Sequence, residues 1–170
     1  MSASIRPAEE RDIPAVAGCV RASYAKYVER IGKEPAPMRR DHAAAIGAGE
    51  TYVLVEGEDL VGTMEVRAEG DHLFVGSVAV RPDRQGEGFG RRLMAFAEDM
   101  AAREDLAEVR LYTNEKMWEN LAFYGRLGFE ETHRKLDGGY RRVFLRKRVD
   151  DRGRPDIEGE AVMRGADDGR

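Results

Sequence analysis

The residues best suited to chemistry lie in a glycine-rich stretch over residues 77–93. An apolar run at 78–80 leads into a loop that contains Gly86, Gly88 and Gly90, and the loop opens directly into a helical pattern. Glycine lets the backbone approach a ligand closely and adopt a positive φ. A helix N-terminus adds unpaired N–H groups and a partial positive charge. The stretch therefore predicts an anion-binding site that suits a pyrophosphate.

Two common nucleotide-binding motifs do not fit this loop. A Walker loop ends in Gly-Lys-Ser/Thr, whereas Gly90 is followed by Arg91 and Arg92. The dinucleotide fingerprint spaces its glycines differently and belongs to the first β-α turn of a parallel sheet. The three histidines lie far apart in the sequence and have no metal-ligand spacing, so we expect no bound metal.

The loop instead resembles the acyl-CoA motif of the GNAT acetyltransferase superfamily. The motif reads Gln85-x-x-Gly88-x-Gly90 and follows Val78-Ala79-Val80-x-Pro82. The family's second cofactor segment is matched by Asn120-x-x-x-Tyr124-x-x-x-Gly128-Phe129. The resemblance covers roughly residues 4–148, and the stretches 32–38 and 113–117 also resemble uncharacterised members of the superfamily. Because both motifs occur in the family's order, the chain resembles an uncharacterised small-domain GNAT protein.

Hydrophobic periods and turn residues predict the element order. We expect strands at residues 4–6, 51–56, 60–68, 72–81, 109–113, 129–136 and 140–148, and helices at 13–31, 39–46, 93–103 and 115–127. Asp12 and Asn114 precede two of these helices and are expected to cap them. Antiparallel strands followed by a β-α-β unit indicate an α+β domain with a mixed, mostly antiparallel sheet flanked by helices. The resemblance adds that a central parallel strand pair splays around the cofactor.

The resemblance also implies that acetyl-CoA is the acyl-donor cosubstrate. Backbone N–H groups from Gln85 to Arg91 would hold its pyrophosphate, and main-chain groups of Val78 and Val80 would hold the pantetheine arm. A main-chain N–H there could also steady the oxyanion as the thioester is attacked. Asn120 is expected to hydrogen-bond the cofactor, although a helix-surface asparagine is equally compatible. The expected cofactor-binding residues are thus Val78, Val80, Gln85, Gly86, Gly88, Gly90, Arg91 and Asn120.

Tyr124 matches the family tyrosine that protonates the departing thiolate, and a phenol near the sulfur can be that general acid. The alternative is a tyrosine that packs in an amphipathic helix beside Phe123. Glu65 lies on the polar side of its strand and is a candidate general base, although a solvated strand face is equally compatible. His72 is a second candidate, and ordered water could replace a side-chain base. Cys19 has no histidine nearby in the sequence and is expected to be a buried small residue.

Composition restricts the partners of the chain. Its formal net charge is −4, whereas a nucleic-acid-binding protein usually carries a basic excess. No apolar run approaches the length of a membrane span, and the first residues lack the apolar core of a signal peptide. The single cysteine excludes an intrachain disulfide. We therefore expect a cytoplasmic protein that binds no nucleic acid and no membrane. Whether it forms a homodimer stays open.

Together these observations predict an N-acetyltransferase that transfers an acetyl group from acetyl-CoA to a primary amine by direct attack in a ternary complex. Two alternatives stay open: a non-catalytic acyl-CoA-binding sensor, and a protein lysine or N-terminus as acceptor in place of a small amine or peptide. We expect residues 1–149 to form the acetyltransferase domain and residues 150–170 to form a flexible hydrophilic tail. The family's variable regions, here the first helix, residues 32–38 and residues 137–140, would frame the acceptor site. The candidate acceptor contacts are Tyr24, Tyr27, Arg30, Glu34 and Met38, while Trp118 is expected in packing or at the rim.

Overall fold

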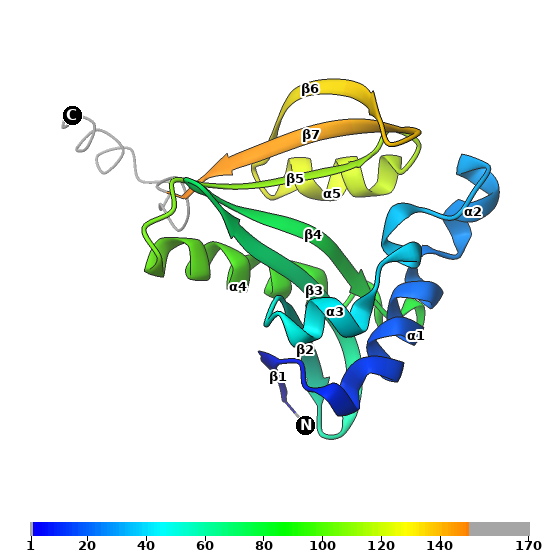
Figure 1. Ribbon diagram of the computed structural model, residues 1–170, viewed down its shortest axis with the longest axis vertical. Helices are drawn as coiled ribbons and strands as arrows, with labels where there is room; N and C mark the ends of the chain where they lie inside the picture. The colour runs from blue at the N-terminus through cyan, green and yellow to red at the C-terminus, as the bar shows by residue number, and fades with distance from the viewer. Residues whose placement is uncertain (1, 150–170) are drawn as a thin grey trace.

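The computed structural model describes residues 2–149, which form one mixed sheet with helices on both faces (Figure 1). The strands are β1 (Ala3–Pro7), β2 (Thr51–Glu56), β3 (Asp59–Glu69), β4 (His72–Val80), β5 (Glu108–Asn114), β6 (Glu130–Asp137) and β7 (Tyr140–Arg148). The helices are α1 (Ile13–Tyr24), α2 (Lys26–Ile31), α3 (His42–Gly47), α4 (Phe89–Arg103) and α5 (Trp118–Arg126), with 3-10 turns η1 (Glu10–Asp12), η2 (Ala36–Arg39) and η3 (Pro82–Arg84). The expected tail, residues 150–170, lies outside the described residues.

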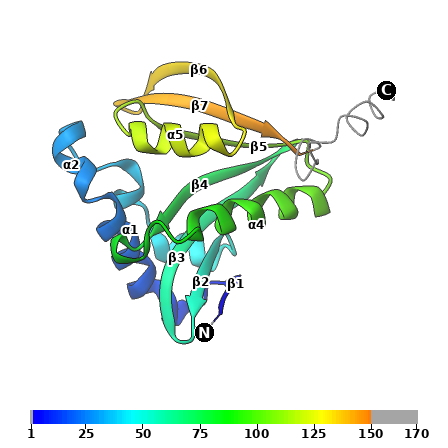
Figure 2. The ribbon, with the colours of Figure 1, turned by 180° about the vertical axis from the view of Figure 1, so that it is seen from behind.

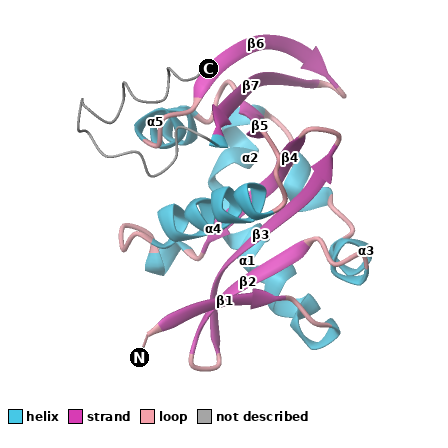
Figure 3. Cartoon of the chain, turned by 90° about the vertical axis from the view of Figure 1, so that its left-hand side faces the viewer, coloured by secondary structure: helices cyan, strands magenta, loops and turns pink. Residues whose placement is uncertain are grey.

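The seven strands lie in the order β1-β2-β3-β4-β5-β7-β6, and Figure 3 shows β1 and β6 at opposite ends of the sheet. Neighbouring strands are antiparallel except for β4 and β5, which are parallel. A parallel pair needs a crossover connection, and α4 provides it. The expected α+β fold with a mostly antiparallel sheet and a central parallel pair is therefore confirmed.

The parallel pair β4–β5 stays together for only part of its length. Its register runs from His72 opposite Glu108 to Val75 opposite Leu111 and then stops, although both strands continue. On the other side of β4, Glu65 pairs with Ser77 and Val66 pairs with Val75, which leaves Gly76 as an extra residue. Such a β-bulge bends its strand and increases the local twist. The strands consequently diverge beyond this point, as the ribbon in Figure 1 shows.

Two layers of helices cover the sheet. Seen from behind, α4 and α5 lie in front of the strands, while α1, α2 and α3 lie on the opposite face (Figure 2). Apolar side chains of α4 such as Leu93 and Met94 are fully buried in the largest core cluster, together with Leu111 of β5 and Val143 of β7. Tyr124 of α5 belongs to the same cluster, so this packing holds both α4 and α5 against the sheet. No helix within residues 2–149 is long and apolar enough to cross a membrane.

Three local expectations were wrong, two of them because a side chain has another partner. Asp12 precedes α1 but does not cap it, since its carboxylate pairs with Arg6 at 2.8 Å and accepts the Glu9 N–H. The single helix expected over residues 13–31 is divided at Ala25 into α1 and α2. Asn114 does not cap α5, which starts at Trp118. Its side-chain oxygen instead accepts the backbone N–H of Lys116 at 2.9 Å, in the turn before the helix.

Candidate functional site

The glycine-rich loop connects β4 to α4 and uses its glycines for two different reasons. Gly86 and Gly88 have φ values of +84° and +85°, a left-handed conformation that other residues adopt with strain. A Cβ at either position would meet no atom within 4 Å, so the backbone there borders open space. Gly90 has no positive φ, but its Cβ would lie 3.3 Å from the Phe123 ring. Gly90 therefore allows the start of α4 to approach α5 closely.

Side chains next to these glycines hold the loop in place. The Gln85 amide nitrogen donates to the Val80 carbonyl at 2.9 Å, which ties the loop back to the end of β4. Arg84 forms ion pairs of 3.0 Å with Glu56 and with Glu87. These two carboxylates raise the pKa of Arg84, with Glu87 contributing most. The Gln85 N–H donates to the Pro82 carbonyl at 3.5 Å, and the N–H groups from Gly86 to Arg91 face no backbone acceptor within residues 2–149, so these remain for a ligand.

A cavity of about 390 Å³ lies between this loop and α5, and we call it the loop cavity. Its lining includes all eight residues that the sequence predicted to bind the cofactor: Val78, Val80, Gln85, Gly86, Gly88, Gly90, Arg91 and Asn120. The positive end of α4 and the Arg91 side chain both favour an anionic ligand here. The open space at Gly86 and Gly88 and this charge fit the pyrophosphate of an acyl-CoA.

A second cavity of about 200 Å³ lies beside the diverging strands and is lined by side chains of β3, β4, β5 and β7, so we call it the sheet cavity. Four residues line both cavities: Tyr24, Val78, Asn120 and Tyr124. The two cavities therefore adjoin at these four residues, beyond the end of the β4–β5 pairing. A ligand in one cavity would lie next to a ligand in the other across this junction.

Tyr124 lies at the junction with its side chain buried. Its ring makes edge-on contacts with Phe123 and Phe129, at centroid distances of 5.1 and 5.7 Å. Burial raises the pKa of its phenol, and the neighbouring Tyr24 and Tyr27 raise it further. Within residues 2–149 no group accepts a hydrogen bond from its hydroxyl. Tyr124 thus packs in the core and also lines both cavities, and its role as general acid stays a prediction.

Tyr24, a candidate acceptor contact, lies at the junction and lines both cavities. Its hydroxyl donates to the Val78 carbonyl at 3.0 Å, and the side chain is buried at the junction. Because the N–H and C=O of one strand residue point to the same side, the Val78 N–H also points away from β3. It is therefore directed toward the gap, as the expected pantetheine and oxyanion contacts require.

Glu65 is buried and lines the sheet cavity, not a solvated strand face. Its carboxylate is held by Arg40, with donor–acceptor distances of 2.6 and 2.8 Å. His72, the second base candidate, lines neither cavity and pairs with Asp71 at 3.1 Å. Cys19 is buried as expected, and burial raises the pKa of its thiol to about 12.

Only one of the remaining four acceptor candidates lines a cavity. Tyr27 lines the loop cavity, whereas Arg30, Glu34 and Met38 line neither cavity. Arg30 stacks 3.8 Å from the centroid of the Trp118 ring, which is 56% exposed. Of the regions expected to frame the acceptor, residues 35–37 and Tyr140 do line the sheet cavity.

Sequence reasoning missed three arginines of the sheet cavity, Arg40, Arg67 and Arg142. Arg67 and Arg142 come from β3 and β7, where a basic residue in an alternating strand is typical of a solvated face. One indication in the sequence was that Glu65 and Arg67, two residues apart, place two charged side chains on the same side of a strand that is otherwise largely apolar. The structure brings these side chains together through strand pairing between distant parts of the chain.

Comparisons with known proteins agree with this arrangement. The family model described as an acetyltransferase (GNAT) domain matches residues 47–131. The crystal structure of PaiA N-acetyltransferase from Thermoplasma acidophilum in complex with coenzyme A aligns with a TM-score of 0.75 at 17% identity, over 87% of this chain and 99% of that chain. The ribosomal-protein-S18-alanine N-acetyltransferase from Escherichia coli aligns with a TM-score of 0.70 at 19% identity, over 87% and 94% of the two chains. At these identities the two structures establish a shared fold.

A shorter match links the sequence to a curated relative. Mycothiol acetyltransferase from Kocuria rhizophila is 42% identical over 57 residues, which are 34% of this chain and 19% of that protein. The chain thus spans about a fifth of the length of this relative. The family model covers half of the chain and includes the whole glycine-rich loop and Tyr124. The chain accordingly belongs to the GNAT superfamily of acyl-CoA-dependent N-acetyltransferases.

Proposed function

We propose that this protein transfers an acetyl group from acetyl-CoA to a primary amine by direct attack in a ternary complex. The observation that carries the proposal is the junction of the two cavities at Tyr24, Val78, Asn120 and Tyr124. Acetyl-CoA enters the loop cavity, and the amine enters the sheet cavity. Neither substrate has to leave before the other binds, because each has its own cavity.

The chain supplies three functions at this junction. Backbone N–H groups of the loop and the N-terminus of α4 hold the pyrophosphate, with Arg91 alongside. The Val78 N–H, directed toward the gap, donates to the thioester oxygen as negative charge develops on it. As the amine nitrogen bonds to the carbonyl carbon, the C–S bond breaks, and Tyr124 gives its proton to the departing thiolate.

The proton released by the amine needs a separate route. Glu65 lines the sheet cavity, but Arg40 engages both of its oxygens. Because both oxygens are already engaged, we assign Glu65 to attracting the acceptor's ammonium group and not to the role of general base. Water in the cavity then carries the proton away, and Tyr124 is reprotonated from solvent when CoA leaves.

The test is a screen of amines, amino acids and peptides for CoA release, followed by Tyr124→Phe with the best acceptor. Removing one hydroxyl leaves the packing volume nearly unchanged, so CoA affinity by calorimetry should hold. Turnover should fall by about 10²–10⁴, the usual contribution of general acid–base catalysis. Peptides with a free N-terminus or a lysine belong in the screen because they test the protein-acceptor alternative.

Tyr52→Phe is the matched control for this substitution. Tyr52 packs on Phe96 at a centroid distance of 5.1 Å and lines neither cavity, so its variant should keep full turnover. Wild-type turnover in Tyr124→Phe would remove the phenol from the mechanism. Tight acetyl-CoA binding without transfer to any amine or peptide would instead identify a sensor of the cofactor.

A further inference from the structure

Arginine and aromatic side chains form one continuous group along the wall of the sheet cavity. The Arg67 guanidinium lies 4.8 Å from the centroid of the Phe74 ring, and the Arg142 guanidinium lies 4.1 Å from that of Tyr112. The Phe74 and Tyr112 rings contact each other at 5.4 Å. All four side chains line the cavity. Stacking of this kind fixes the plane of a guanidinium group before any ligand arrives.

The charges of the lining are unbalanced toward positive. Its charged members are Arg40, Arg67 and Arg142 on one side and Glu65 on the other. Arg40 is shared by two carboxylates, Glu65 at 2.6 Å and Glu50 at 3.7 Å, so these three side chains together carry a net negative formal charge. The other two arginines form ion pairs with carboxylates outside the lining, Arg67 with Glu69 at 2.6 Å and Arg142 with Asp137 at 3.0 Å, so their positive charge is the one that faces the cavity.

Arg67 and Arg142 keep most of their hydrogen-bond donors. Arg67 donates through Nε to Glu69, and Arg142 donates through Nη1 to Asp137. Both carboxylates lie outside the cavity lining. Within residues 2–149 the remaining guanidinium N–H groups of this pair have no other hydrogen-bond acceptor, although the Arg142 side chain is only 14% exposed. The Arg67 side chain is 39% exposed, and guanidinium groups held in position at a cavity wall are well suited to bind an oxyanion in a bidentate manner.

We propose that the acceptor amine also carries a carboxylate, which Arg67 and Arg142 bind. This inference rests on the proposed function and specifies the substrate class of the same site. Glu65, two residues before Arg67 on the same side of β3, attracts the ammonium group of such an acceptor. The cavity thus complements an amino acid in both charges. A polyamine, which is only cationic, would place its second charge against two arginines.

The experiment compares amino acids with their carboxamides, which keep the amine and lose the negative charge. The kcat/KM for CoA release should be at least about tenfold higher for the acid of each pair, because a hydrogen bond to a charged group contributes more than one to a neutral group. Arg142→Gln should lower kcat/KM for the acids by about 10- to 100-fold, mainly through KM, and should leave the amides nearly unchanged. Arg67→Gln provides a second variant if Arg142→Gln melts early.

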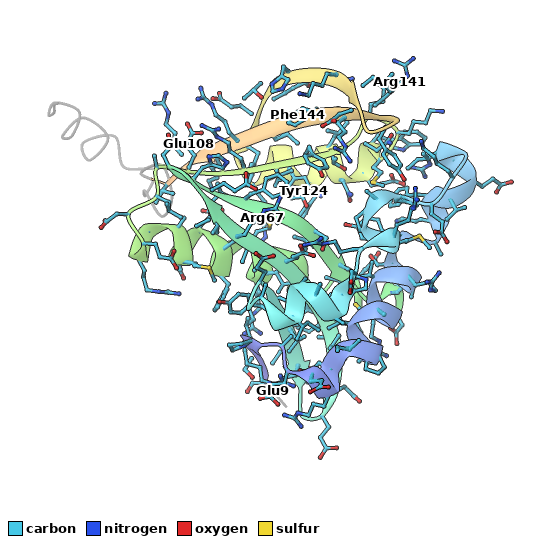
Figure 4. All side chains as sticks on the ribbon, in the orientation of Figure 1. Glu9, Arg67, Glu108, Tyr124, Arg141 and Phe144 are labelled. Carbon is cyan, nitrogen blue, oxygen red and sulfur yellow. The ribbon has the colours of Figure 1, made fainter. Side chains whose placement is uncertain are left out.

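Arg141→Gln is the control, because Arg141 is the neighbouring residue on β7 but lines neither cavity. Figure 4 shows Arg141 at the outer rim beyond β7, whereas Arg67 and Tyr124 lie in the interior between the strands. Its variant should behave like the wild type. Amides as effective as acids, or equal effects of Arg142→Gln and Arg141→Gln, would overturn the carboxylate proposal and leave the acetyltransferase function intact.

A binding measurement distinguishes failure of the carboxylate proposal from failure of the proposed acetyl transfer. The probes are N-acetyl amino acids and their N-acetyl amides, titrated into the CoA-bound protein by calorimetry. Binding of the acids that is weakened by Arg142→Gln, without turnover of any amine, would uphold the carboxylate site and overturn the proposed function. Absence of both transfer and binding would overturn both.

Discussion

At the scale of single residues, burial determines the protonation of Tyr124. A tyrosine in water has a pKa of about 10, and burial raises the pKa of this phenol above that value. The active form of a general acid is the protonated one, so a raised pKa extends its working range upward. We expect kcat/KM to rise with pH as the acceptor amine loses its proton and to show no fall at about pH 10. A descending limb at about pH 10 that is missing in Tyr124→Phe would show a normally titrating phenol.

Burial also makes Cys19 unreactive. Burial raises the pKa of its thiol to about 12, and the thiolate is the nucleophilic form. A disulfide reagent such as dithiobis-nitrobenzoate should therefore fail to label the native protein at neutral pH and should label it fully in denaturant. Cys19→Ala should retain wild-type turnover. Rapid labelling of the native protein together with inactivation would place the thiol in the mechanism.

At the scale of elements, the loop before α4 should bind CoA through backbone that a side chain would obstruct. We predict that Gly88→Glu abolishes CoA binding, because Gly88 borders the open space of the loop cavity and a carboxylate there repels the pyrophosphate. The variant should fold, since its Cβ would meet no atom within 4 Å. Calorimetry with CoA measures the loss, and thermal melting checks the fold.

Gly49→Glu is the matched control for the loop. Gly49 has a φ of +76° and equally open surroundings, but it lies between α3 and β2 and lines neither cavity. Both variants should therefore lose similar stability from the strained backbone, while only the substitution at Gly88 affects CoA. Unchanged CoA affinity in Gly88→Glu would contradict the assignment of this loop.

How far the sequence predicts these elements depends on the range of the interactions. The β4–loop–α4 unit was predictable because its glycines and helix start act within a few residues, and all predicted cofactor-binding residues line one cavity. The division of the first helix at Ala25 was not predictable, since alanine favours helix and Ala25 keeps helical φ and ψ angles. The hydrogen bond from the Tyr24 hydroxyl to Val78, far along the chain, was not predictable either. Similarly, the arginines of the sheet cavity meet through strand register, which a local pattern does not encode.

At the scale of the whole molecule, the mixed sheet provides the geometry from which we predict sequential binding of the two substrates. Parallel pairing of β4 and β5 ends at Val75 and Leu111, and beyond this point the two cavities adjoin at the four residues that line both. A ping-pong reaction would need a nucleophile at this junction. Of the shared residues Tyr24, Val78, Asn120 and Tyr124, the only ionisable ones are tyrosines, whose raised pKa values keep them protonated and weakly nucleophilic.

We therefore predict sequential kinetics, in which double-reciprocal plots at several acceptor concentrations intersect and do not run parallel. Incubation with acetyl-CoA alone should leave the protein unmodified by mass spectrometry, and a compound that joins CoA to the accepted amine should compete with both substrates. That competition follows from geometry, because only such a compound fills the loop cavity and the sheet cavity through the gap. Parallel plots together with an acetylated protein would require a covalent intermediate and would contradict direct attack at the junction.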